Sequence, residues 1–112
     1  MQNFVYIKEG NYAKGCKKLK EIIENELTQG DELIEGDLLE LEEPFKPRLT
    51  SVFKFRSGSK WKIVTKYDLL GRRIFDEMWI DEDISMKEYR ESALFLIWYQ
   101  SEMGRPNIIH FF

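Results

Sequence analysis

The chain contains one histidine and one cysteine, the side chains that most often serve as a general base and as a nucleophile. A thiol at Cys16 activated by the imidazole of His110 would form a Cys–His dyad. Cys16, however, falls on the apolar stripe of a predicted helix, which is typical of a small core residue. His110 lies in an apolar run, which favours a partly buried residue at a sheet edge. The dyad stays an alternative, and packing is the simpler role for both side chains.

No other group of residues has the spacing of a catalytic or ligand-binding motif. The sequence lacks a glycine-rich phosphate loop, a G-x-S-x-G nucleophile motif and the spacing of zinc ligands. Pairs of carboxylates are frequent in any chain this acidic, so they carry no information. We therefore predict a protein that is not an enzyme and that has no catalytic residues, no bound metal and no cofactor.

Residues 53–68, FKFRSGSKWKIVTKYD, concentrate positive charge in a chain whose formal net charge is -3. Side chains alternate between the two faces of a strand, so the aromatic residues point to the core and the cations share the solvated face. Clusters of this kind bind phosphate backbones, although base stacking needs exposed aromatic rings. The face is either solvated and neutralised by the chain's own acids, or it binds nucleic acid or an acidic protein. The candidate basic binding face consists of Lys54, Arg56, Lys60, Lys62 and Lys66.

The preceding segment has the opposite charge. Residues 21–43 contain ten Asp or Glu and no Lys or Arg, whereas residues 44–73 contain nine Lys or Arg and one acid. Such polarisation bears on electrostatic steering and on the choice of partner. Rows of carboxylates can mimic a nucleic-acid backbone. They can also bind a cation, but the spacing of a calcium-binding loop is missing from this segment. The candidate acidic face consists of Glu35, Asp37, Glu40 and Glu42, with a simple solvated face as the alternative.

Two helices are predicted from the periodicity of apolar residues. The first spans about 12–28, where apolar residues recur at spacings of three and four. The second spans about 86–103 and begins with Ser85 and Glu88, which form a capping box. Its middle, residues 93–99, is apolar on every side of the helix. This helix is therefore either enclosed by the sheet and the first helix, or one of its flanks meets another molecule.

Alternating and β-branched segments predict the strands. Residues 31–44 favour a strand with one acidic face, with a second short helix as the competing interpretation. Prolines make 44–48 a connector. Turn residues separate the segments 48–56, 60–68 and 72–80 and so predict an antiparallel meander of three strands. The final apolar segment, 107–112, could pair with the first strand at the sheet edge. The predicted strands span 3–9, 48–56, 60–68, 72–80 and 107–112.

These elements predict one α+β domain. Its antiparallel sheet has about four to six strands, with the three-stranded meander of 48–80 at the centre. Both helices pack on one face of the sheet, and helix 86–103 is central to the core. A chain of 112 residues with 43% apolar residues has enough interior for one hydrophobic core.

Two families resemble this order of elements. Helix, three antiparallel strands and helix over 12–103 resemble a double-stranded-RNA-binding domain. That family carries lysines at the start of its second helix, where this chain has the acidic segment DEDISMKEY. A strand followed by a lysine-rich helix and later basic strands also resembles the RelE-type ribosome-dependent RNases, which would imply an RNase. Those toxins end in strands and lack a long apolar final helix.

The leading functional hypothesis is a small protein-binding module, an adaptor or inhibitor of the kind found in bacteria and their phages. Charge polarisation and the apolar excess of helix 86–103 and of the C-terminal IIHFF support it. Self-association through that helix or the final strand belongs to the same hypothesis. Nucleic-acid binding by the basic hairpin is the alternative, and a RelE-like RNase is the third. The uncharged run ALFLIWYQS is about half of the roughly 20 residues that span a bilayer, and with a single cysteine and no signal sequence we expect a cytoplasmic protein.

Overall fold

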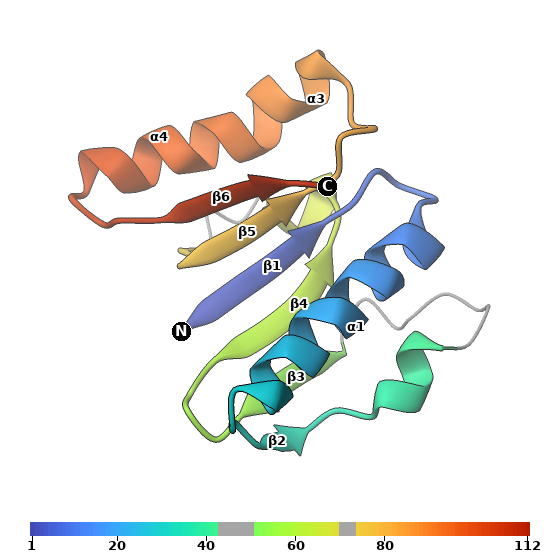
Figure 1. The fold of residues 1–112 in the computed structure, drawn as a ribbon. Coiled ribbons are helices and arrows are strands. Elements are labelled where there is room, and N and C mark those ends of the chain that lie inside the picture. The colour runs from blue at the N-terminus through green and yellow to red at the C-terminus, as the bar shows by residue number, and fades with distance from the viewer. Residues whose placement is uncertain (43–50, 70–73) are drawn as a thin grey trace.

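The computed structural model describes residues 1–42, 51–69 and 74–112, which form an α+β fold around a mixed six-stranded sheet (Figure 1). The strands lie in the order β2-β3-β4-β1-β5-β6. The predicted connector 44–48 lies outside the described residues. The end of the predicted segment 31–44 and the starts of the predicted strands 48–56 and 72–80 also lie outside them. The strands are β1 (Gln2–Tyr6), β2 (Leu33–Glu35), β3 (Val52–Phe55), β4 (Lys60–Val64), β5 (Glu77–Ile80) and β6 (Ile108–Phe111).

The two long helical segments lie where the sequence predicts them. Helix α1 spans Tyr12–Thr28. The second segment is continuous and consists of α3 (Met86–Tyr89), a π-helical turn η2 (Arg90–Leu94) and α4 (Phe95–Glu102). The Ser85 hydroxyl accepts a hydrogen bond from the backbone N–H of Glu88, which confirms the predicted cap. Two short helices, the 3-10 helix η1 (Leu38–Leu41) and α2 (Lys66–Leu69), complete the set.

The predicted meander is correct for its first two strands and wrong for its third. β3 and β4 form an antiparallel hairpin, but β5 pairs in parallel with β1. The predicted strand 60–68 ends at Val64, and its last residues belong to α2. β4 therefore does not lead into a hairpin turn, and β5 cannot pair with it as a third strand of the meander. β6 pairs in parallel with β5 rather than with the first strand. The sheet is therefore mixed rather than purely antiparallel.

Strand β1 is the centre of this arrangement. β4 and β5 flank it on both sides, and both run parallel to it. Its last three residues and the following Ile7 form the run FVYI (4–7), which is apolar without alternation and entirely buried. A continuous apolar run is typical of a parallel strand that is covered on both faces. The N-terminal sequence thus contains the signal for a central strand, although its length alone suggested an ordinary short strand.

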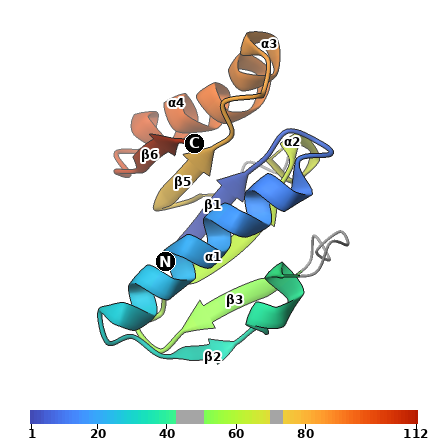
Figure 2. The same ribbon diagram turned by 45° about the vertical axis from the view of Figure 1, so that its right-hand side comes forward.

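The helices cover opposite faces of the sheet, contrary to the prediction that both lie on one face (Figure 2). Val5 of β1 packs with residues of α1, whereas Phe4 and Tyr6 pack with residues of the helical segment 86–102. Successive strand residues point to opposite faces, so a strand that is apolar at every position needs a cover on each side. The core is therefore divided by the sheet into two clusters.

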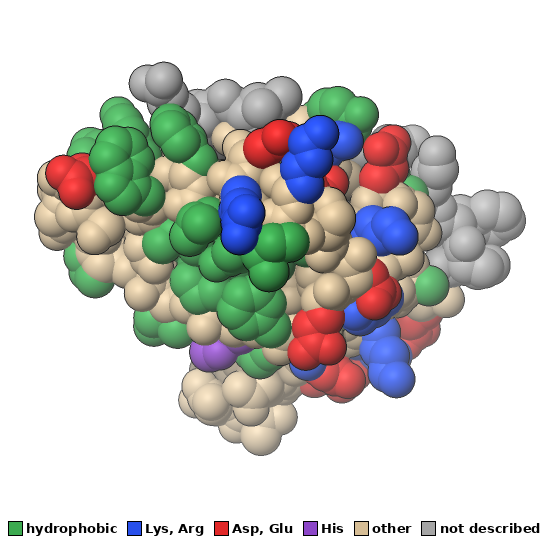
Figure 3. All heavy atoms as spheres, turned by 90° about the horizontal axis from the view of Figure 1, so that it is seen from above, with side chains coloured by type: hydrophobic (Ala, Val, Ile, Leu, Met, Phe, Trp, Pro, Cys, Tyr) green, Lys and Arg blue, Asp and Glu red, His purple; other side chains and the backbone are tan. Residues whose placement is uncertain are grey.

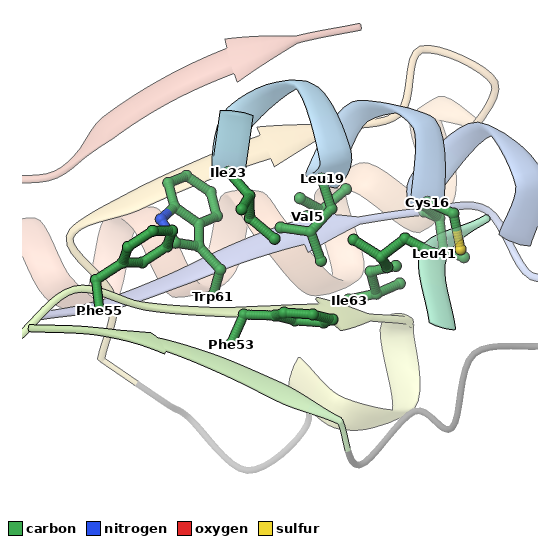
Figure 4. Close-up of a cluster of buried hydrophobic side chains, with 10 residues drawn as sticks. Val5, Cys16, Leu19, Ile23, Leu41, Phe53, Phe55, Trp61 and Ile63 are labelled. Carbon is green, nitrogen blue, oxygen red and sulfur yellow. The ribbon is translucent and has the colours of Figure 1, made fainter. Parts of the chain in front are cut away.

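The cluster beneath α1 contains the aromatic residues of the basic hairpin (Figure 4). Phe53, Phe55 and Trp61 are buried there, as strand alternation predicted. The same prediction is wrong for Tyr67, which lies in α2 rather than in a strand and is exposed. Cys16 belongs to the same cluster, and burial raises the pKa of its thiol. Residues 31–42 form the short strand β2 followed by η1, so each competing interpretation of this segment was partly right. Leu41 closes the cluster from η1.

Asp81 ties the carboxyl ends of β1 and β5 together. Its buried carboxylate accepts hydrogen bonds from the backbone N–H groups of Lys8 and Asp83, each at 2.9 Å. The amide of Asn11 donates at 2.9 Å and the ammonium of Lys14 at 2.6 Å. Burial alone would raise the pKa of Asp81, but the Lys14 ammonium and these N–H donors outweigh it and hold the pKa below its usual range.

Replacing Gly15 by alanine should destabilise the protein even though alanine is the better helix former. A Cβ at Gly15 would lie 2.7 Å from Cγ2 of the buried Ile7, so α1 would have to move away from the sheet. We expect a loss of about 1–3 kcal/mol of unfolding free energy in urea. The control is Ala13→Gly on the exposed side of α1, which should cost about 1 kcal/mol through propensity alone. A Gly15→Ala variant more stable than wild type would contradict the close approach.

Replacing Asp81 by asparagine should cost about 3 kcal/mol near neutral pH, because an amide N–H₂ would face donors that now bind a carboxylate. A carboxylate whose pKa is lowered by folding stabilises above its unfolded pKa of about 3.9 and loses that contribution as pH falls through the folded value. The difference between wild type and Asp81→Asn should therefore shrink in urea titrations as pH is lowered from about 6 to below 4. A difference that stays constant with pH would show that charge has no part in it.

Candidate interaction surfaces

The structure brings three of the five predicted basic residues onto one sheet face. Lys54, Lys60 and Lys62 lie on the face of β3 and β4 opposite to the buried aromatic residues, and Lys54 is directly opposite Lys60 in the register. Lys66 instead begins α2 and lies over the Tyr67 ring, 5.2 Å from its centroid. Arg56 follows the end of β3 and is exposed. The five cations therefore do not form one flat row.

The chain's own acidic segment supplies partners for two of these cations. Lys54 forms an ion pair with Glu35 at 2.9 Å, and Arg56 forms one with Glu32 at 2.9 Å. β2 lies beside β3, which places these acids next to the hairpin. Within the described parts of the chain, Lys60 and Lys62 make no ion pair. They line a shallow hollow of about 200 Å³ together with Lys54.

The four residues of the candidate acidic face do not form an open row of carboxylates. Glu35 pairs with Lys54, and Glu42 pairs with Lys20 of α1 at 2.6 Å. Asp37 caps η1 by accepting a hydrogen bond from the backbone N–H of Leu39, and Glu40 accepts one from the hydroxyl of Ser51. No set of three or more His, Cys, Asp or Glu residues in the described ranges is arranged to hold a metal ion. These acids therefore act first within the chain.

His110 is a partly buried residue of the edge strand, as the sequence indicated. Its ring stacks on Trp79 with centroids 4.2 Å apart, and its Nε2 lies 3.5 Å from a carboxylate oxygen of Glu77. The imidazole ring of His110 therefore packs on side chains of β5. Among the described contacts, none joins it to Cys16.

An apolar surface spans α4 and β6. Figure 3 shows hydrophobic side chains gathered on the face that carries these two elements. Trp98 of α4 is 56% exposed and Phe111 of β6 is 53% exposed. The rings of Phe95 and Trp98 pack against each other with centroids 6.0 Å apart. We define the α4–β6 surface as Leu94 of η2, Phe95 and Trp98 of α4, and Phe111 of β6. Ile108 is also exposed, but strand alternation turns it to the α1 face of the sheet.

The exposure of Trp98 decides between the two interpretations of helix 86–103. Ala93 and Leu96 face the sheet and are buried, but Leu94, Phe95 and Trp98 point away from it. The expectation that the sheet and the first helix enclose this helix is wrong, because α1 lies on the other face of the sheet. One flank of an uncharged segment is thus left in contact with solvent.

The outer edge of β6 adds backbone hydrogen-bonding groups to this surface. β6 is the last strand of the described sheet. The N–H groups of Ile108 and Phe112 donate to carbonyls on the β5 side. Along a strand the N–H and C=O groups of successive residues point to alternate sides, so those of Ile109 and Phe111 point outward. The apolar composition of this strand can be read from the sequence, but its place at the outer edge depends on the sheet topology.

No helix in residues 1–42, 51–69 and 74–112 combines the length and the apolarity needed to cross a membrane. Comparison of the chain with protein-family models, with curated proteins and with solved structures finds no match.

Trp98 and Leu96 should respond differently to truncation. Leu96 is 1% exposed, so Leu96→Ala should cost about 2–5 kcal/mol of unfolding free energy. Trp98→Ser removes a side chain that is more than half exposed, and should change the stability by less than about 1 kcal/mol. Urea unfolding followed by circular dichroism measures both. Equal losses in the two variants would mean that Trp98 is part of the core.

Proposed function

We propose that this chain is a non-enzymatic protein-binding module, an adaptor or inhibitor, that docks its partner on the α4–β6 surface. The observation that carries the proposal is the coincidence of exposed large apolar side chains with an open sheet edge on one face. Each feature alone is common in small proteins. Together they provide apolar contacts and directional hydrogen bonds for the same partner.

The composition of the surface supports a protein partner. Interface centres are depleted in charged residues and enriched in aromatic ones, and tryptophan is frequent among the residues that dominate binding energy. The segment from Ser92 to Ser101 contains no charged residue, and it carries the exposed rings of Phe95 and Trp98. Arg90, Glu91 and Glu102 bound it along the sequence and are exposed. This is the distribution of an apolar centre with a polar rim.

The edge of β6 indicates how the partner binds. An extended segment can add to an open sheet edge, where backbone hydrogen bonds provide affinity and alternate side chains provide specificity. The outward groups of Ile109 and Phe111 would pair with such a segment. Its apolar side chains on the α4 side of the sheet would then lie along Phe111 and the flank of α4. A second copy of the chain could supply this segment from its own β6, and light scattering distinguishes that case from a different protein.

The proposal is tested by comparing two double variants of the immobilised protein in a lysate of the source organism. Phe95→Ser with Trp98→Ser removes the aromatic centre of the α4–β6 surface. Lys60→Ser with Lys62→Ser is the matched control, because it removes two lysines of the hairpin face that make no ion pair within the described residues. We expect quantitative mass spectrometry to show at least about a tenfold loss of the partner with the aromatic variant alone.

Two results would contradict the proposal. One is a partner that the aromatic variant retains and the lysine variant loses, which would assign docking to the hairpin face. The other is a wild-type protein that captures nothing more than the aromatic variant and is a monomer in light scattering. Circular dichroism melting of both variants must first show a folded protein, and we expect this because Phe95, Trp98 and Lys60 are exposed and Lys62 is partly exposed.

A further inference from the structure

A cavity of about 420 Å³ lies between α2 and the start of the helical segment 86–102. Lys66 and Tyr67 line it from α2, while Ser85, Glu88, Glu91 and Ser92 are among the residues that line it from the other side. Small-molecule sites have volumes of about 300 to 1,000 Å³. The cavity is distinct from the α4–β6 surface, because the two share no residue.

The position of the cavity in the sheet is one that binds ligands in open parallel sheets. Such sheets bind ligands outside the carboxyl ends of their strands, where neighbouring strands send their helices to opposite faces. Here α2 follows β4, and Ser85 lies in the turn between β5 and α3. β1 lies between these two strands and sends α1 to the other face. The strand arrangement therefore places the cavity beside such a switch point.

The wall on the side of α3 is held in place by buried contacts. The hydroxyl oxygens of Ser92 and Tyr6, the last residue of β1, are 2.7 Å apart, and the Ser92 hydroxyl also donates to the carbonyl of Glu88 at 2.6 Å. Burial raises the pKa of Tyr6 to about 12, with the nearby Glu88 carboxylate adding to the rise, so the phenol is neutral. Ser92 lies in the π-helical turn, a local irregularity that is often found at functional sites.

The two walls carry opposite charges. The α2 wall has the ammonium of Lys66 beside the Tyr67 ring, and the facing wall has the carboxylates of Glu88 and Glu91. Lys87 of α3 also lines the cavity, so the α3 wall carries one cation beside its two carboxylates. The Oε2 atom of Glu88 is buried and meets no donor at full hydrogen-bond geometry within the described residues, and the phenol of Tyr6 is the polar group whose pKa this carboxylate raises. A buried acceptor without a well-placed donor is destabilising, and a donor brought by a ligand would satisfy it.

We propose that this cavity binds a small zwitterion of the free α-amino acid class. The ligand's carboxylate would face Lys66, and its ammonium group would face Glu88 and Glu91. A ligand with only one of the two charges would satisfy one wall and leave the other as it is. The site is therefore selective for molecules that carry both charges within a few bond lengths.

Nuclear magnetic resonance titration of the ¹⁵N-labelled chain with pools of L-amino acids tests this site. Acetate and ethylamine, which each carry one of the two charges, are the comparison probes. We expect the amide signals of Tyr67, Ser85 and Ser92 to shift saturably with at least one amino acid. Its dissociation constant should be lower by about tenfold or more than that of either comparison probe.

Variants separate the site from a general charge effect. Glu88→Gln and Lys66→Gln should each weaken binding by about tenfold. Glu88→Gln keeps the helix cap, because Ser85 binds the backbone N–H of Glu88 and not its side chain. Glu102→Gln, on the same helical segment but outside the cavity, should leave binding unchanged. The inference is overturned if no amino acid shifts these signals, if acetate or ethylamine binds equally well, or if Glu102→Gln weakens binding as much as Glu88→Gln.

Discussion

The carboxylate of Asp81 lies where β1, β5 and α1 meet, and the arrangement of the two helical layers depends on it. It accepts hydrogen bonds from the backbone that follows β1, from Asn11 and Lys14 at the start of α1, and from the turn that follows β5. Lys14 also donates to the carbonyl of Phe112, which brings the end of β6 to the same point. A buried carboxylate is tolerated when donors satisfy both of its oxygens, and here they do.

This junction has consequences for both faces of the sheet. α1 leaves β1 toward one face and α3 leaves β5 toward the other, so each helical layer covers only part of the sheet. On the face of β3 and β4 that carries Lys54 and Lys60, the described helices reach only the end of β4, where Val64 and Leu69 of α2 belong to one core cluster. Acids of β2 and its neighbouring turn compensate part of the charge of this face. α4, in turn, packs on the sheet with one side only. The apolar flank that remains exposed is the α4–β6 surface.

The features that depend on local sequence could be predicted. The apolar stripe of α1, the Ser85 cap and the alternation of Phe53 and Phe55 with Lys54 are each determined by residues within a few positions of one another. Strand partners were the main error, because the pairing of β5 with β1 joins residues more than seventy positions apart. The FVYI run of β1 did contain a signal, since an apolar strand without alternation needs cover on both faces.

The candidate sites follow the same division. Strand alternation correctly placed three lysines on one face, but it could not show that Glu32 and Glu35 would lie beside them. The apolar excess of residues 93–99 was visible in the sequence, while the direction of its exposed flank depends on which face α1 occupies. The cavity between α2 and α3 is lined by residues about twenty positions apart in the sequence. These residues come together only because β4 and β5 flank β1 in the sheet, so no local sequence pattern indicates the cavity.

The most direct test of partner docking on the α4–β6 surface is residue-resolved amide hydrogen exchange of the chain, alone and with its captured partner. The account predicts fast exchange at Ile109 and Phe111 in the isolated chain, because their N–H groups point away from β5. Binding should slow both by about tenfold or more, while His110, which faces β5, changes little. Unchanged exchange at Ile109 and Phe111, with new protection confined to β3 and β4, would contradict the account.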